Sequence, residues 1–456
     1  DASFNGAVTF NADVSFNSQL SITNYLNTTT TDVTTTTEVT TTSTIWDQLG
    51  SNITGAALND YFGLSVALSN NGQIVAVGGP GNDTASSNAG HVRVYEYNNN
   101  AWTQLGSDIL GKASNNIYFG TNVSLSSNGM IVAIGSKVYN QKDYVGVYEY
   151  TNNEWSQLGS NIDETVNGVT IQRGVSLSSN GQIVAIGDGR SNHTRVYQYS
   201  NNAWNLLGSV ITGTVSTDRF GSAVSLSSNG DIVAIGAYFN DDSGADAGHV
   251  EVYQYSNNAW NLLGSAIEGK AAGDNSGISV SLSSNGSIVA IGAYKNDDSG
   301  ADAGHVRVYQ YSNNAWNLLG SAIEGQAAWD AFGGSVSLSS DGYTLAIGAS
   351  EYDGTGGLST GHIRVYQYSN STWVQSGSDI EGEGSYDRIG GGGALSLSSD
   401  GTILAYKDGS EGVKVIEMTD TTTTNAITNT VTVPMLDISS NVSLNAKLAV
   451  TDDATL

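Results

Sequence analysis

The chain has 456 residues, of which 39% are apolar and only 13% charged, yet its formal net charge is −27 at pH 7. Such an acidic excess repels phosphate groups, so we expect neither a nucleic-acid partner nor binding to anionic membranes. The absence of cysteine excludes disulfides and thiolate metal sites, and no apolar run has the length for membrane insertion. The lack of a signal-like segment at Asp1 is consistent with a processed chain.

The first 27 residues have a period of six, in a V-x-F-N rhythm. The members of the two apolar series are Ala2, Val8, Val14 and Leu20, and Phe4, Phe10, Phe16 and Ile22. This period predicts a hexad-repeat β tail over 1–27, built as the rungs of a β-solenoid or of an intertwined fibre shaft. A few ordinary strands are the alternative.

A threonine-rich linker is predicted over 28–44, and a second one over 419–434. Because β-branched threonine favours extended chain, stiff spacers and further strands are both possible, as is an O-glycosylated stalk.

Between the linkers, one tryptophan recurs at a mean spacing of about 54 residues, and four short apolar runs accompany each copy. The seven anchors are Trp46, Trp102, Trp155, Trp204, Trp260, Trp316 and Trp373. A repeat of this length and content is typical of a β-propeller blade, so the sequence predicts an all-β, seven-bladed β-propeller over 45–418. We expect the anchors to pack between blades.

One repeat shows the four strands, which we label A to D. Strand A ends at Asn229-Gly230, a strong two-residue hairpin signal. The apolar run 232–236 is strand B, and the alternating run 249–255 is strand C. The run 259–267 is predicted as one strand D. The long B–C loop and the long D–A connection should lie together at one end of the blade, which we call the top.

The phase of the repeat predicts how the ring closes. A D strand, Trp46–Ile53, precedes every A strand, and the last repeat ends with its C strand, Val413–Met418. We therefore expect the first strand to complete the last blade, which removes two exposed sheet edges.

The run 62–80 resembles the FG-GAP repeat found in the seven-bladed head of integrin α-chains. Phe62-Gly63 matches the FG, and Gly78-Gly79-Pro80 stands for the GAP. The resemblance covers roughly 46–418 and implies a seven-bladed propeller. The family often has a calcium loop between the two motifs, but this chain has hairpins such as Asn71-Gly72, so we expect no calcium there. A weaker resemblance, to sialidase Asp-box turns, rests on SSDG at 339–342 and 398–401.

The last segment, 435–456, repeats the hexad period through Leu436, Val442 and Leu448. Hexads in both tails resemble repeats of viral and phage fibres and of marine microbial surface proteins. Because so few rungs bury little surface, we expect the tails to self-associate or to join a longer shaft.

Two sets of titratable residues recur at fixed repeat positions. A histidine follows a glycine at four of them, and an aspartate precedes strand A at five. The histidines are His91, His249, His305 and His362, and the aspartates are Asp60, Asp218, Asp274, Asp330 and Asp387. Equivalent positions in successive blades lie too far apart to share a zinc ion, so we interpret the histidines as structural. We expect the aspartates to cap their own loops.

Two B–C loops read D-D-S-G-A-D and could bind a divalent cation. The candidate ligands are Asp242, Asp246, Asp298 and Asp302. Few carboxylates serve each site and the spacing is not that of an EF-hand, so we expect weak Ca²⁺ binding, with a Kd of roughly 10⁻⁴–10⁻³ M.

Trp329 is the one tryptophan off the repeat register and stands beside Asp330. With Tyr238, Tyr294 and Tyr352 it could form platforms for a glycan or another cell-surface ligand. The alternative is that these aromatic side chains cover the ends of the blades.

Eight N-x-S/T sequons are candidate glycosylation sites: Asn27, Asn52, Asn82, Asn122, Asn192, Asn285, Asn370 and Asn441.

No nucleophile, metalloprotease or nucleotide-binding motif occurs, so we expect no catalysis. The sequence favours a structural or adhesive protein of the extracellular, cell or virion surface, with the propeller displayed on a fibre or filament shaft. A glycan-binding lectin is the second hypothesis, and a glycoside-cleaving propeller enzyme is the third.

Overall fold

The computed structural model describes residues 2–4, 14–15, 27–57, 59–138, 143–163, 174–409, 412–437, 442–444 and 449–450. These residues form strands, turns and loops but no helix. Within them there is accordingly no helix long and apolar enough to span a membrane. The chain divides into two compact units, one of residues 44–420 and one of residues 1–43 with 421–456.

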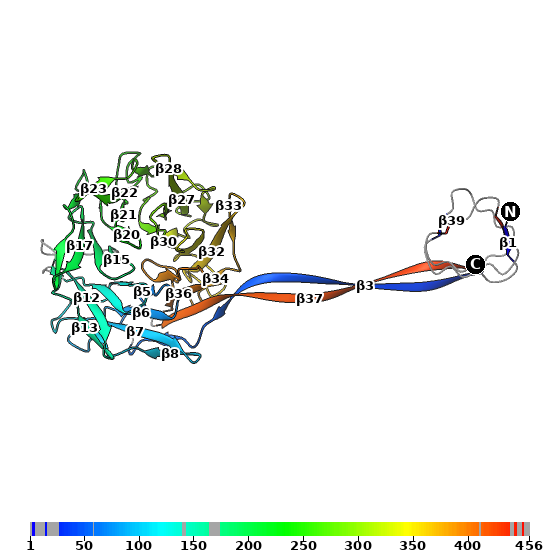
Figure 1. Ribbon diagram of the computed structural model, residues 1–456, viewed down its shortest axis with the longest axis horizontal. Coiled ribbons are helices and arrows are strands. Elements are labelled where there is room, and N and C mark those ends of the chain that lie inside the picture. Colours follow the sequence, from blue (N-terminus) through cyan, green and yellow to red (C-terminus); the bar gives the residue numbers. More distant parts are fainter. Residues whose placement is uncertain are drawn as a thin grey trace. The chain divides into compact units, whose positions relative to one another are not determined.

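The larger unit is a seven-bladed β-propeller, as the sequence predicts, with seven five-stranded sheets around a common centre (Figure 1). Blade 1 contains β5 (Ser65–Leu68), β6 (Ile74–Gly79), β7 (His91–Asn98), β8 (Ala101–Gln104) and β9 (Ile109–Leu110). Blade 2 contains β10 (Asn122–Leu125), β11 (Ile131–Gly135), β12 (Tyr144–Thr151), β13 (Glu154–Gln157) and β14 (Ile162–Asp163). Blade 3 contains β15 (Val175–Leu177), β16 (Ile183–Asp188), β17 (His193–Ser200), β18 (Ala203–Leu206) and β19 (Ile211–Thr212). Blade 4 contains β20 (Ala223–Leu226), β21 (Ile232–Ala237), β22 (His249–Ser256), β23 (Ala259–Leu262) and β24 (Ile267–Glu268).

The remaining blades follow in chain order. Blade 5 contains β25 (Ser279–Leu282), β26 (Ile288–Ala293), β27 (His305–Ser312), β28 (Ala315–Leu318) and β29 (Ile323–Glu324). Blade 6 contains β30 (Phe332–Leu338), β31 (Thr344–Ala349), β32 (His362–Ser369), β33 (Thr372–Gln375) and β34 (Ile380–Glu381). Blade 7 contains β35 (Leu395–Leu397), β36 (Ile403–Asp408) and β37 (Gly412–Asp437), and is completed by β3 (Asn27–Gln48) and β4 (Ile53–Thr54).

The outer strand of each blade is divided, which corrects the prediction of one continuous D strand. In blade 4 both β23 and β24 pair with β22, and residues 263–266 lie between them. Gly264, with a φ of 79°, turns the chain there. The break serves the joint between blades, because the carbonyl of Leu263 accepts the indole N–H of Trp316 at 2.8 Å.

All seven anchor tryptophans make this contact with the preceding blade, which confirms that they pack between blades. The indole N–H groups of Trp46, Trp102, Trp155, Trp204, Trp260, Trp316 and Trp373 donate to the carbonyls of Ser376, Leu49, Leu105, Leu158, Leu207, Leu263 and Leu319, respectively.

The ring closes where the repeat phase predicts. β3 and β4 pair with β37, and Ile53 lies opposite Val413. The N–H of Leu49 also donates to Val415 O at 2.8 Å. The first strands of the chain thus complete the blade formed by its last strands.

The turns between the first two strands of each blade form a closed circle of backbone hydrogen bonds. The N–H groups of Asn70, Ser127, Ser179, Ser228, Ser284, Ser340 and Ser399 donate to the carbonyls of Ser127, Ser179, Ser228, Ser284, Ser340, Ser399 and Asn70, respectively. Every blade is therefore joined to both neighbours at this end of the ring.

In the smaller unit the two threonine-rich segments are further strands, which was one of the predicted alternatives. Thr40 contacts Thr424 and Ser43 contacts Thr421, so β3 and β37 pair here in opposite directions. The short strands β1 (Ala2–Phe4) and β2 (Val14–Ser15) pair with β38 (Val442–Leu444) and β39 (Ala449–Val450). Most of both hexad tails lies outside the described residues, so the shaft stays a prediction.

Candidate functional site

The long loops of neighbouring blades meet at the top. Parallel bridges join the B–C loop of one blade to the residues that precede strand A of the next, as between Gly248 and Ser276 and between Gly361 and Ile389. The aspartates before strand A hold these loops. Asp218 Oδ2 accepts a hydrogen bond from Asn240 Nδ2 at 2.9 Å, and Asp330 Oδ2 accepts the N–H of Ala327 at 2.8 Å.

The four repeat histidines open their C strands and are buried. In the strand register each lies opposite the last piece of its outer strand. The pairs are His91 with Leu110, His249 with Glu268, His305 with Glu324, and His362 with Glu381.

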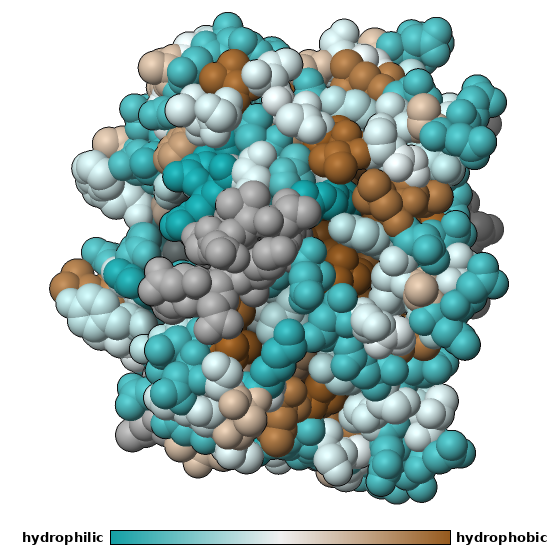
Figure 2. Space-filling model, turned by 90° about the vertical axis from the view of Figure 1, so that its left-hand side faces the viewer, coloured by the Kyte–Doolittle hydropathy of each residue, from teal (hydrophilic) through white to brown (hydrophobic). Residues whose placement is uncertain are grey.

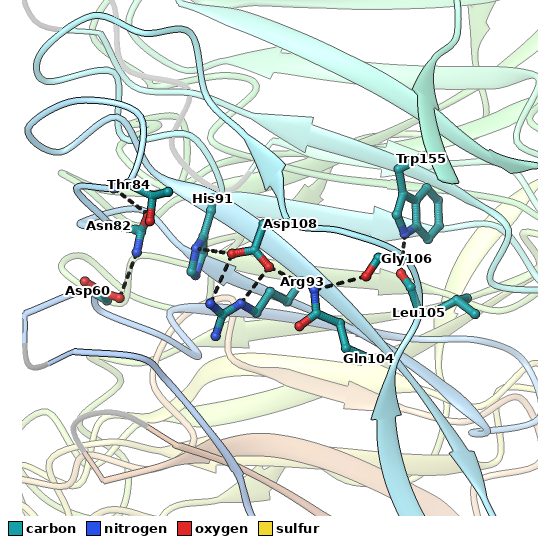
Figure 3. A network of polar contacts seen from close by, with 10 residues as sticks. All are labelled: Asp60, Asn82, Thr84, His91, Arg93, Gln104, Leu105, Gly106, Asp108 and Trp155. Carbon is teal, nitrogen blue, oxygen red and sulfur yellow. Dashed lines mark hydrogen bonds and ion pairs between the residues drawn. The ribbon is translucent and has the colours of Figure 1, made fainter. Parts of the chain in front are cut away.

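In blade 1 an arginine neutralises the carboxylate beside the histidine (Figure 3). Asp108 Oδ2 lies 3.5 Å from His91 Nδ1, and Arg93 donates to both carboxylate oxygens at 2.9 and 3.0 Å. Burial works against the charge of Asp108, but the hydrogen bonds from Arg93 and Gln104 hold its pKa below the ordinary value. Burial lowers the pKa of His91.

Blade 6 repeats this arrangement. Arg364 donates to Asp379 at 2.8 and 2.5 Å, and burial lowers the pKa of His362 to about 4. In both blades the chain therefore supplies its own cation to a carboxylate next to a neutral histidine.

Blades 4 and 5 contain a different cluster, in which one histidine and two carboxylates converge. One cluster consists of Asp242, His249 and Glu268, and in each cluster the three potential ligand atoms lie within 4.8 Å of one another. His249 Nδ1 is 3.9 Å from Asp242 Oδ2. Burial raises the pKa of Glu268, and the nearby carboxylates of Asp242 and Glu251 add to that rise.

The second cluster consists of Asp298, His305 and Glu324. His305 Nδ1 lies 3.7 Å from Asp298 Oδ2 and 3.8 Å from Glu324 Oε2. Burial lowers the pKa of His305 to about 4, so the imidazole is neutral near pH 7. Unlike the blade 4 cluster, this one contains an ammonium group, because Lys270 Nζ lies 2.5 Å from Asp298 Oδ2.

Of the four aspartates proposed from the sequence, the structure places Asp242 and Asp298 in these clusters. Asp246 and Asp302 lie outside them, with backbone N–H groups that donate to Asp241 and Asp297 at 2.7 Å. The weak Ca²⁺ site stays a prediction.

The sequence analysis named His249 and His305 but interpreted them as structural, and it missed Glu268 and Glu324. The available signal was the repeat register, which pairs the histidine of G-H-V with the glutamate of A-I-E.

The aromatic candidates separate into exposed and covered residues. Trp329 is 63% exposed, whereas Asp330 beside it is buried. Tyr238 packs on Phe239, and Tyr352 lies edge-on to His362 with ring centroids 4.3 Å apart. Tyr294 is partly buried beside Lys295. Sequence reasoning missed Tyr386, which is 64% exposed and occupies the position of Trp329 in the next repeat.

The sequons also differ in access. Asn82 and Asn192 are buried and hydrogen-bonded, to Asp60 and to the N–H of Phe220, which makes them poor acceptors of a glycan. Asn52, Asn285 and Asn370 are exposed, and Asn122 is partly buried. The structure does not describe the side chain of Asn27 or any part of Asn441.

Comparisons with known proteins define the class. The family model described as "FG-GAP repeat" matches residues 54–95 and 213–253, so the chain carries FG-GAP repeats on a seven-bladed propeller. No curated protein matches the sequence.

Solved structures share the fold at low identity. The β-propeller domain of Cps50 (Swd1) from Myceliophteria thermophila has a TM-score of 0.53 at 12% identity, over 82% of this chain and 100% of that one. A putative 6-phosphogluconolactonase from Bacteroides uniformis has a TM-score of 0.51 at 12% identity, over 72% of this chain and 88% of that one. Similarity at this level shows the propeller fold alone.

Proposed function

We propose that this protein is a non-catalytic structural or adhesive protein of an extracellular, cell or virion surface, with the propeller as its binding head. One observation carries the proposal: the ring is inserted between two segments that pair with each other. β3 and β37 pair within blade 7 and again outside the ring, through Ser43–Thr421 and Thr40–Thr424. This pairing supports attachment of the tails to other copies or to a longer shaft.

The surface and the repeats support this role. FG-GAP repeats are typical of extracellular or surface proteins. In the view of Figure 2, hydrophobic side chains form separate groups among hydrophilic ones. Scattered hydrophobic groups are normal on a solvent-exposed surface. We therefore assign association between copies to the tails rather than to the side of the ring in that view.

Light scattering tests the proposal. The full chain should form oligomers that a chain of residues 45–420 does not form. A full chain that stays monomeric at high concentration, with protease-sensitive tails, would contradict the role of the tails and favour a free lectin.

Glycan binding is the second candidate, and exposed aromatic side chains favour it. Trp329 and Tyr386 occupy the same repeat position in adjacent repeats, and both are more than 60% exposed. Their N–H groups donate to Ala301 and Leu358 of the preceding B–C loops, which fixes the backbone beneath each ring. Flat exposed rings of this kind can stack on the apolar face of a sugar.

A glycan array separates the two functions. If the loops bind sugar, Trp329→Ala and Tyr386→Ala should abolish binding, whereas Val374→Ala, at an exposed residue on β33, should not. Binding that all three variants retain would exclude these rings as the sugar platform.

A further inference from the structure

We propose that the cluster of Asp242, His249 and Glu268 binds a divalent transition-metal ion, with Zn²⁺ as the best fit, and that the cluster of Asp298, His305 and Glu324 is a second, weaker site for the same ion.

The first argument is the geometry of the donor atoms. Each cluster offers one imidazole nitrogen and two carboxylate oxygens within 4.8 Å of one another. Ligands about 2.1 Å from a tetrahedral ion lie roughly 3.4 Å apart. Three of the pairs, at 3.7 to 3.9 Å, therefore need a contraction of only a few tenths of an ångström. The remaining pairs, within 4.8 Å, need at most about 1.4 Å, which side-chain rotation supplies.

The second argument is that buried nitrogen and oxygen atoms in each cluster, which could bind a metal ion, have no hydrogen-bond partner. These atoms are Nδ1 of His249 and Oε2 of Glu268 in blade 4, and Nδ1 of His305 and Oε2 of Glu324 in blade 5. The side chains of His249 and His305 are 6% and 0% exposed, so water does not readily replace a partner. A buried polar atom without a partner costs roughly 1–3 kcal/mol, which a bound ion would relieve.

The third argument comes from a comparison of blades, because different residues surround the equivalent buried histidine in blade 1. Blade 1 has Thr84 and Leu110 where blade 4 has Asp242 and Glu268. The carboxylate near the histidine of blade 1 is that of Asp108, and it forms a salt bridge with Arg93. Blade 4 has Ala266 in place of Asp108 and Glu251 in place of Arg93. Blade 4 thus has convergent carboxylates where blade 1 has an arginine–aspartate pair.

The two clusters differ in charge, which sets their order of affinity. In blade 5 the ammonium of Lys270 contacts Asp298, and Arg307 is also close enough to lower the pKa of His305. The residue that corresponds to Lys270 for the blade 4 cluster is Thr214, which carries no charge. A cation next to a ligand opposes a second cation, so the blade 4 site should be the tighter one.

The donor set decides the class of ion. Ca²⁺ and Mg²⁺ prefer oxygen ligands, whereas imidazole with carboxylates suits Zn²⁺ and similar ions. Calorimetric titration of the chelator-treated full chain with Zn²⁺ should therefore show two unequal sites, and titration with Ca²⁺ should show much weaker binding at these residues.

Substitutions taken from blade 1 provide the decisive variant, because the fold already accepts them at the equivalent positions. The double substitution Asp242→Thr, Glu268→Leu should lower Zn²⁺ affinity at the tighter site by about 100-fold or more. Asp246→Asn is the matched control, since it removes one exposed charge from the same loop outside the cluster, and it should leave Zn²⁺ binding unchanged.

Lys270→Thr tests the order of affinity and should strengthen the second site several-fold. Zn²⁺ should also raise the melting temperature of the native chain, but less in the double variant. Equal Zn²⁺ binding by the double variant and the native chain would show non-specific binding to an acidic surface and overturn the proposal. Ca²⁺ binding as tight as that of Zn²⁺ would overturn the assigned class of ion.

Discussion

At the scale of single residues, glycine pairs explain the FG-GAP pattern. A Cβ atom on Gly236, near the end of strand B of blade 4 (β21), would lie 2.1 Å from the carbonyl oxygen of Gly277 in the next repeat. The glycine of GAP and the glycine of FG thus meet across the joint between blades. The same contact recurs between Gly78 and Gly120, Gly187 and Gly221, Gly292 and Gly333, and Gly348 and Gly390.

We predict that Gly236→Ala destabilises the propeller by at least about 3 kcal/mol, because the new methyl group meets backbone atoms that cannot move aside. Gly273→Ala is the control. That position has a φ of 88° but no atom within 4 Å of the added Cβ, so the loss should be about 1–2 kcal/mol. Urea unfolding measures both values, and equal losses would contradict the steric explanation.

Buried histidines make the stability depend on pH. Tyr352 and Phe332 pack on His362, and Arg364 and Asp379 are the charged groups nearby. Burial lowers its pKa from 6.5 to about 4, so between these values the unfolded chain binds a proton that the folded chain does not. Folded stability is therefore lost as the pH falls through this window.

We predict that the native chain loses about 3 kcal/mol more stability between pH 7 and pH 4 than His362→Phe does. The carboxylates titrate in both proteins, so their contribution cancels in the difference. Urea unfolding at several pH values provides the measurement, and parallel stability curves would show that His362 does not contribute.

At the scale of elements, the joint in blade 7 holds the ring closed. β4 pairs with β37, Ile53 is buried against Val413, and Trp46 donates to Ser376 of blade 6 at 3.2 Å. These contacts join residues more than 300 positions apart, so ring closure depends on both ends of the chain.

Removal of residues 1–43 should leave the melting temperature of the propeller nearly unchanged, because the larger unit begins at Thr44. Removal of residues 1–54 takes away β4 and the strand segment that contains Trp46, which opens blade 7, so the melting temperature should fall by many degrees. Calorimetry compares the two chains. A chain that starts at Gly55 and melts like the one that starts at Thr44 would contradict closure by these strands.

At the scale of the whole molecule, the charge of −27 opposes the compact state. Raising NaCl from about 0.01 to 0.15 M shortens the Debye length from roughly 30 to 8 Å and screens this repulsion. We predict a rise in melting temperature of a few degrees, measured by calorimetry with a chelator present to remove the contribution of bound cations. An unchanged or lower melting temperature would show that self-repulsion is negligible.

The repeat sequence by itself determined the seven blades, the tight hairpins and the closing strand, because each follows from local patterns that recur in register. Asn229-Gly230 specifies its turn, and Trp46 marks an outer strand that precedes the first complete repeat. Only the tertiary structure decided that the outer strand breaks at Gly264, since the reason for the break is Trp316 of the next blade. It also decided that Asp242, His249 and Glu268 converge. These residues stand on a loop and two strands, and the strand pairing and loop path that join them depend on contacts across the blade.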